Sequence, residues 1–267
     1  MNNIKLIQNN PYHILEFLLL LAGALLPFSF SPYELFWLQY PLLAFLFISV
    51  IKQSPKIAFY RGMIFGFGWF VHGVHWVFYS LHYHGGAPVF FAVLVVVLLS
   101  IYLSLFPALA LYFVNRFIKA SSLQFFVIVY PFSWMFFDWL RGYFLTGMPW
   151  LQIGVAHIDT YLAGFAPVIG GLGIGLLATI VAGLLALIFN GQYMKSSVLV
   201  IALIYACGYL LGQINWTQSL GEPLKVSLIQ GNIPQSEKWR RELYTPTLQM
   251  YRQLTLDNAG SDLIVWP

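Results

Sequence analysis

Long apolar stretches recur along the whole chain, and they constrain its fold more than any other feature of the sequence. About 17–25 predominantly apolar residues suffice for a helix to cross the ~30 Å hydrocarbon core of a bilayer. Seven stretches approach or exceed this length, and turn residues or charges separate them. Because a helix satisfies its backbone amides within one segment, we predict about seven membrane-spanning helices. The predicted spans are 14–30, 35–51, 57–81, 88–115, 122–140, 164–190 and 196–214.

The charged residues are too few for a soluble protein of this length. They make up 8% of the 267 residues, whereas 60% are hydrophobic. A soluble domain carries roughly 25% charged residues. The composition therefore excludes a soluble enzyme, a disordered segment, a coiled coil and a nucleic-acid-binding protein.

The positive charges indicate an orientation for the predicted spans. If the amino terminus is cytoplasmic, one basic residue, Arg141, lies in the opposite loops, and the positive-inside rule favours that arrangement. Residues after about 215 then lie on the far side, which is the periplasm in a bacterium. The basic residues assigned to the cytoplasmic side are Lys5, Lys52, Lys56, Arg61, Arg116, Lys119 and Lys195.

The first stretch has a second interpretation, as a cleaved signal peptide. Lys5 and the small residues Ala22 to Ala24 fit that pattern loosely. Glu16, however, interrupts the apolar run, and apolar residues continue to Phe30. These features favour a retained span.

The composition changes near Trp216. Residues 216–267 carry five basic and five acidic residues. Two short runs rich in Val and Ile, 225–233 and 262–266, predict strands, and 236–258 predicts a helix between them. Two strands are too few to form a stable sheet alone. We therefore predict a mainly α protein: a polytopic helical membrane bundle (1–215), followed by the first βαβ unit of an incomplete α/β domain (216–267).

Few ionisable residues of the predicted spans suggest chemistry. Asp138 and Arg141 are three residues apart, so they can pair on one helix face. The pair is either a functional site or an interfacial anchor that orients the loop 142–152. Cys207 lies in an apolar helix, where a reactive thiolate is disfavoured. The histidines lack nearby cysteine pairs or carboxylates, so we expect no metal site and no cofactor, and contacts with lipid head groups instead.

Five motifs together resemble the apolipoprotein N-acyltransferase family. Their order and spacing along the whole chain make the resemblance specific, although no single motif decides it. The motifs are FSFSPYEL (28–35), GFGWFVHGVHWVFYSLHYHGGAP (66–88), WLRGYFLTGMPWLQIG (139–154), VSLIQGNIPQSEKW (226–239) and DLIVWP (262–267).

The resemblance implies an enzyme of the bacterial inner membrane with a periplasmic nitrilase-like domain. The family transfers a fatty acyl chain from a phospholipid, typically phosphatidylethanolamine, to the α-amino group of an apolipoprotein's diacylglyceryl-cysteine. The expected partners are therefore a phospholipid acyl donor, the diacylglyceryl apolipoprotein and membrane lipids.

In this family a Glu-Lys-Cys triad carries the chemistry, and the Glu directly follows a Trp-Pro pair. Here that pair is Trp266 and Pro267, the last two residues of the sequence. We therefore expect no triad residue in this chain and no acyl transfer by the chain alone. Any triacylated product would contradict this expectation.

The same resemblance suggests four substrate-contacting residues. Trp239 matches a family tryptophan near the active-site entrance, although it also fits as the first apolar residue of an amphipathic helix. Arg141, Trp150 and Gln152 match a second stretch on the periplasmic side, where an arginine can hold a phosphate.

Two other functions remain open from the sequence. One is a transporter, because Gly85-Gly86 and the glycines between 170 and 175 resemble breaks in spanning helices. The other is a non-catalytic scaffold or a gene remnant.

Overall fold

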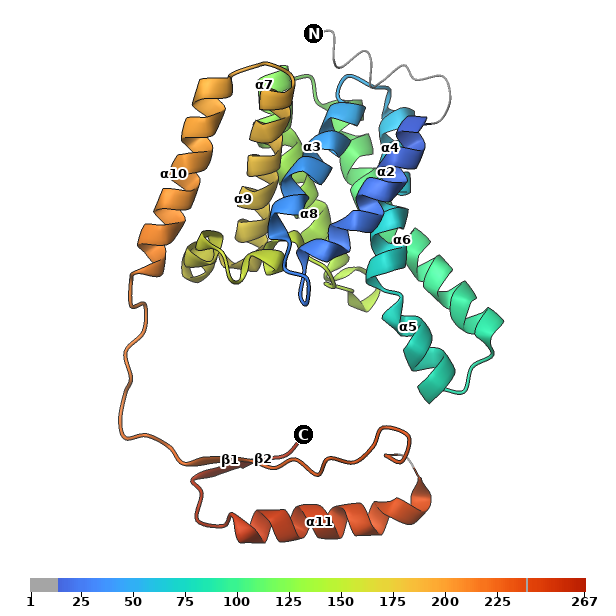
Figure 1. The fold of residues 1–267 in the computed structure, drawn as a ribbon, viewed down its shortest axis with the longest axis vertical. Helices are drawn as coiled ribbons and strands as arrows, with labels where there is room; N and C mark the ends of the chain where they lie inside the picture. Colours follow the sequence, from blue (N-terminus) through green and yellow to red (C-terminus); the bar gives the residue numbers. More distant parts are fainter. Residues whose placement is uncertain (1–13, 239) are drawn as a thin grey trace.

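The computed structural model describes residues 14–238 and 240–267 as a helical bundle followed by a small separate unit. The bundle helices run side by side, and a linker carries the chain beyond one end of the bundle to the unit (Figure 1). The bundle helices are α2 (Ile14–Leu25), α3 (Gln39–Val50), α4 (Pro55–Gly73), α5 (Trp76–Tyr79), α6 (Val89–Phe117), α7 (Ser122–Gln124), α8 (Tyr130–Arg141), α9 (Ala166–Phe189) and α10 (Met194–Gly212).

Within the described residues, four helical segments are long and apolar enough to cross a membrane. They are Val89–Phe117, Ser122–Arg141, Tyr161–Phe189 and Met194–Gly212. Ile14–Ser29 and Phe36–Val50 are shorter apolar helical segments. These segments support the predicted membrane bundle, whereas the count of seven spans stays a prediction.

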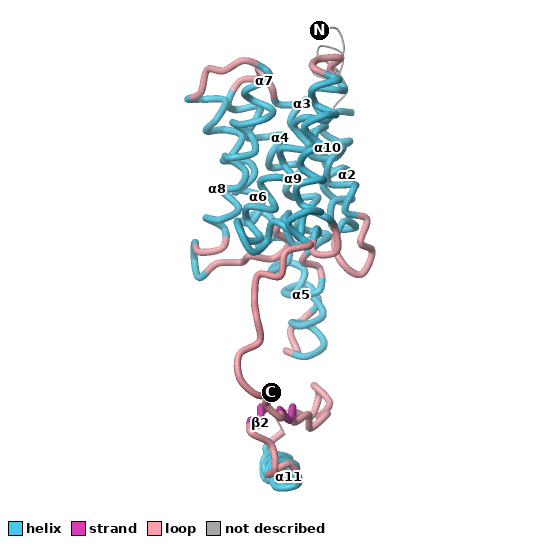
Figure 2. Tube along the Cα trace, turned by 90° about the vertical axis from the view of Figure 1, so that its left-hand side faces the viewer, coloured by secondary structure: helices cyan, strands magenta, loops and turns pink. Residues whose placement is uncertain are grey.

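The third predicted span, residues 57–81, is interrupted after Gly73. Its first part belongs to α4, which ends at Gly73, and α5 and a π-helical turn at Ser80–His84 follow. This α5 segment projects from the same end of the bundle as the linker to the C-terminal unit (Figure 2). The predicted continuous span is therefore wrong beyond Gly73.

Arg61 was assigned to the cytoplasmic side, but it lies within α4. It is 5% exposed, and its Nε atom lies 3.7 Å from a carboxylate oxygen of Glu16 on α2. Its Nη1 donates to the carbonyl of Ser49 at 2.5 Å. Because these contacts hold Arg61 inside the protein, it is not a loop charge that reports orientation.

The C-terminal unit contains the predicted strand–helix–strand order. Strands β1 (Val226–Leu228) and β2 (Leu263–Val265) pair in parallel, with Val226 opposite Leu263. Helix α11 (Tyr244–Asp257) connects them. It begins eight residues later than expected because Pro246 lacks an N–H and is tolerated only in a first helical turn.

Candidate functional site

A cleft of about 810 Å³ opens at the end of the bundle nearest the C-terminal unit. Three segments that are distant in sequence form it: residues 27–36 after α2, residues 72–76 at the junction of α4 and α5, and residues 149–160. Its aromatic and titratable lining residues are Phe30, Tyr33, Glu34, Phe36, His72, His75, Trp76, Trp150 and Asp159.

Two indole rings form part of the cleft wall. The ring centroids of Trp76 and Trp150 are 5.4 Å apart, and the side chains are about half exposed. An indole combines a large apolar surface with one N–H donor, which suits the boundary between hydrocarbon and water. The structure therefore places Trp150, a residue predicted from the sequence, in the cleft.

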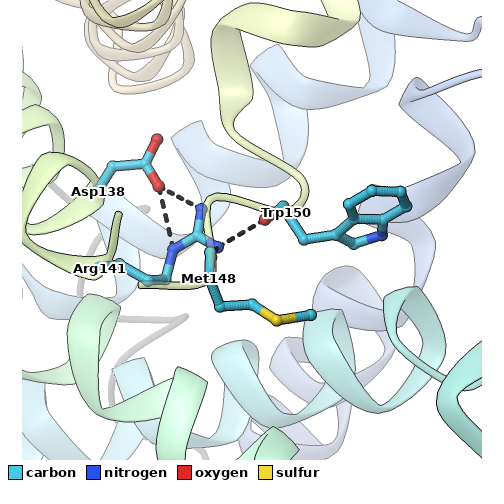
Figure 3. A network of polar contacts seen from close by, with 4 residues as sticks. All are labelled: Asp138, Arg141, Met148 and Trp150. Carbon is cyan, nitrogen blue, oxygen red and sulfur yellow. Dashed lines mark hydrogen bonds and ion pairs between the residues drawn. The ribbon is translucent and has the colours of Figure 1, made fainter. Parts of the chain in front are cut away.

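Arg141 holds the loop that carries Trp150 (Figure 3). Its Nη1 donates to the carbonyls of Met148 and Trp150, at 2.7 and 2.5 Å. Its Nε and Nη2 donate to Oδ1 of Asp138, with Nε at 3.2 Å. The predicted pairing of Asp138 with Arg141 is therefore confirmed.

These contacts favour the anchoring role for Arg141. Its side chain is 1% exposed, and its guanidinium lies 5.3 Å from the ring centroid of Phe70. The loop that it holds is strained, because Leu145 and Thr146 have positive φ angles of 50° and 72°. Arg141 thus shapes the wall of the cleft from behind, and the cleft lining contains Trp150 but not Arg141.

The other two predicted site residues have different outcomes. Gln152 is half-buried at the start of a 3₁₀ turn, Ile153–His157, two residues after Trp150 and outside the cleft lining. Trp239 lies outside the described residues, so its role stays a prediction.

A buried polar cluster behind the cleft was not predicted. Gln39 and His157 are both 0% exposed, and His157 Nε2 lies 3.0 Å from Gln39 Oε1. Burial lowers the pKa of His157 from 6.5 to about 4, so the imidazole is neutral at physiological pH. The sequence offered one signal of this cluster, a glutamine within an apolar stretch. The contact itself could not be predicted, because the two residues are 118 positions apart.

The comparison with known families decides the relationship. The family model for the apolipoprotein N-acyltransferase N-terminal domain matches residues 22–184. This chain belongs to the apolipoprotein N-acyltransferase family. The resemblance seen in the five motifs is therefore confirmed.

Several curated relatives are named apolipoprotein N-acyltransferase. Those from Methylococcus capsulatus, Shewanella oneidensis and Coxiella burnetii are 41%, 36% and 35% identical, over 94%, 95% and 94% of this chain. The chain covers 50%, 49% and 52% of their respective lengths. It thus spans about half the length of the curated relatives that it matches.

Proposed function

We propose that the chain supplies the membrane-embedded part of an apolipoprotein N-acyltransferase. This activity transfers an acyl chain from a phospholipid to the α-amino group of a diacylglyceryl-cysteine. Family membership carries the proposal, since the family model and the relatives are both named for apolipoprotein N-acyltransferase. The proposed cellular location is the bacterial inner membrane, with the amino terminus in the cytoplasm and the cleft at the periplasmic face.

The cleft is the proposed entry site for the phospholipid acyl donor. Moving acyl chains from a bilayer into water costs about 0.8 kcal/mol per CH₂ group. A cleft at the membrane boundary avoids this cost, because the acyl chains remain in the outer leaflet. The half-exposed Trp76 and Trp150, with Tyr33 in the same cleft lining, offer the amphipathic surface that such a lipid needs.

The C-terminal unit, in residues 216–267, is the proposed start of a nitrilase-like domain. Its support is an uncovered apolar surface on the strands, because Val226, Leu228, Leu263 and Val265 are each more than 40% exposed. A sheet stabilises itself by burying such a surface against another layer.

The chemistry proposed for the family proceeds in two covalent steps. A glutamate takes the proton of a cysteine thiol, the sulfur attacks the lipid ester and a lysine stabilises the oxyanion; the lysophospholipid leaves as an alcohol with that proton. The lipoprotein amine then attacks the resulting thioester, which forms the amide and releases the cysteine as its thiol. We assign no residue of this chain to the triad, and the role of the chain is to position the lipid.

Removal of the chain's gene from its source cell tests the proposed function. Lipoproteins from the deletion strain should retain a free α-amino group on the diacylglyceryl-cysteine, as read by mass spectrometry of amino-terminal peptides. Unchanged N-acylation would contradict the proposal and favour a scaffold or remnant.

Trp150→Ala tests the cleft itself. Loss of an indole contact worth about 0.5–1.5 kcal/mol should weaken phosphatidylethanolamine binding by about two- to tenfold. Native mass spectrometry of the detergent-solubilised chain, titrated with phosphatidylethanolamine, measures this affinity. Trp37→Ala is the matched control, because Trp37 is 53% exposed and outside the cleft. Equal losses in both variants would argue against the cleft as the lipid site.

A further inference from the structure

A chain of hydrogen bonds runs behind the cleft and connects its walls. We name it the His157 chain and define it by Ser29, Gln39, Tyr40, His157 and Tyr205. Gln39 Nε2 donates to Ser29 Oγ at 3.1 Å and to the carbonyl of Ile153 at 3.3 Å. On its other side, Gln39 Oε1 lies 3.0 Å from His157 Nε2.

The carbonyl of Ile153 fixes the direction of these bonds. A carbonyl only accepts, so the atom of Gln39 that faces Ile153 must be the amide nitrogen. Ser29 donates its own proton to the carbonyl of Leu26 at 2.6 Å, which leaves its oxygen to accept from Gln39. Gln39 Oε1 therefore faces the imidazole, and His157 must carry a proton on Nε2.

The other side of the imidazole completes the chain. Thr160 Oγ1 donates to the carbonyl of His157 at 3.0 Å, so the hydroxyl proton of Thr160 is not available to Nδ1 of the imidazole. Since the imidazole is neutral, Nδ1 accepts from the hydroxyl of Tyr40, which lies 3.5 Å away and in turn bonds Tyr205 of α10. Among the described residues, Tyr40 is the titratable side chain in direct contact with the imidazole, and the ring of Phe36 packs against its edge.

We propose that His157, as a neutral imidazole protonated on Nε2, is a positioning residue that fixes the spacing between two walls of the cleft. Ser29 belongs to the wall formed by residues 27–36, and the neighbours of His157, Ala156 and Ile158, belong to the wall formed by residues 149–160. Gln39 and His157 join these walls through the protein interior. That the cleft holds a lipid rests on the proposed function, whereas the spacing does not.

The burial of His157 excludes direct contact with a ligand in the cleft. Its side chain is 0% exposed, and it is not part of the cleft lining. Any effect on lipid binding must therefore act through the wall positions.

Spin labels on the two walls test the spacing. In a Cys207→Ala background, labels at Tyr33→Cys and Ile158→Cys report the distance by electron paramagnetic resonance; both positions are exposed and line the cleft from these two walls. We expect one narrow distance distribution in the parent, a broad one in His157→Phe, and a narrow one again in His157→Gln, whose amide can donate to Gln39. His84→Phe, at an exposed histidine outside the cleft, should change nothing.

The protonation state has its own test. Nitrogen NMR of histidine-labelled protein, with His157 assigned by its absence in His157→Gln, should show a neutral imidazole with hydrogen on Nε2 at pH 7. A proton on Nδ1, or a narrow distance distribution in His157→Phe, would overturn the proposal.

Phosphatidylethanolamine binding separates this inference from the proposed function. If the parent protein binds no phosphatidylethanolamine while the distance distributions respond as expected, the lipid assignment of the cleft fails and the positioning role of His157 stands. If the parent binds it, His157→Phe should bind about tenfold more weakly and His157→Gln nearly as well as the parent.

Discussion

At the residue scale, Arg141 and Asp138 form an ion pair beside the loop that carries Trp150. Both side chains are buried, and the guanidinium also binds two carbonyls of the strained loop. A buried ion pair adds little net stability, but removing one partner leaves an uncompensated charge. The two residues therefore make the loop conformation sensitive to substitution.

We predict that Arg141→Ala lowers the free energy of unfolding by about 3–5 kcal/mol. The loss has two sources, the buried Asp138 carboxylate without its partner and the freed carbonyls of Met148 and Trp150. Denaturant titration of the detergent-solubilised protein measures it. Arg116→Ala is the control: Arg116 is exposed over the ring of Phe117, and its loss should change stability by no more than about 0.5 kcal/mol.

His157 should make stability depend on pH. Its pKa is about 4 in the folded protein and 6.5 as a free group, so the unfolded chain binds more protons between these values. Stability is therefore complete above pH 6.5 and falls as the pH drops towards 4, by up to about 3 kcal/mol. The difference in the free energy of unfolding between the parent and His157→Phe, measured by unfolding titrations, should shrink as the pH falls through this window. A difference that does not change with pH would contradict the prediction.

The residue-scale predictions from sequence succeeded where the partners are close along the chain. Asp138 and Arg141 are three positions apart on one helix, which fixes their proximity. Gln39 and His157 are 118 positions apart, and only the packing of α3 against the segment before α9 brings them together. Local spacing carries no information about such a contact.

At the element scale, α10 is attached to the bundle by close backbone contact. About 11% of its span is buried, and its main contact is with the 3₁₀ turn Tyr161–Phe165. A Cβ placed on Gly208 would collide with the carbonyl oxygen of Tyr161 and lie 3.0 Å from its carbon. Small residues permit such helix contacts in membranes.

Gly208→Ala should therefore separate α10 from the turn and destabilise the protein by about 1–3 kcal/mol. Thermal unfolding in detergent measures the effect. Gly212→Ala is a matched control one turn further along, since a Cβ there meets only the Cα of Gly164, at 3.9 Å. A similar loss in both variants would show that helix propensity, rather than close contact, causes the change.

The sequence predicted the helical stretches better than their interruptions. Pro131 lacks an N–H and clashes with the preceding turn, and the chain accommodates it through a π-helical turn at Phe125–Val129. Gly170, with φ of 65°, interrupts α9 near its start. A transporter's broken helices are interrupted near the membrane midplane, so this position does not favour a transporter.

At the scale of the whole molecule, the bundle has two chemically different ends. The connections from α3 to α4, from α6 to α7 and from α9 to α10 lie at one end. The first two carry Lys52 and Lys119, and Lys195 lies in the first turn of α10 at the same end. The cleft and the linker to the C-terminal unit lie at the other end. The cleft itself was not predictable from sequence, because its three segments meet only through helix packing.

This arrangement predicts the sidedness of the protein. Positive loops favour the cytoplasm, so the opposite end of the bundle, with the linker, should face the periplasm. In a Cys207→Ala background, Ser219→Cys in the linker should therefore react with a membrane-impermeant thiol reagent in spheroplasts. Lys119→Cys should react only after permeabilisation, as measured by gel shift. The reverse pattern would invert the orientation and remove the cleft from the periplasmic face.

The connection between α10 and β1 has a consequence for encounter rates. Thirteen residues separate Gly212 from Val226. A flexible linker of that length has a root-mean-square end-to-end distance of about 20 Å, and it holds the C-terminal unit at an effective concentration in the millimolar range near the bundle. A lipid already in the cleft would then meet the C-terminal unit at a frequency set by the length of the linker. The abundance of that lipid in the membrane would not set this frequency.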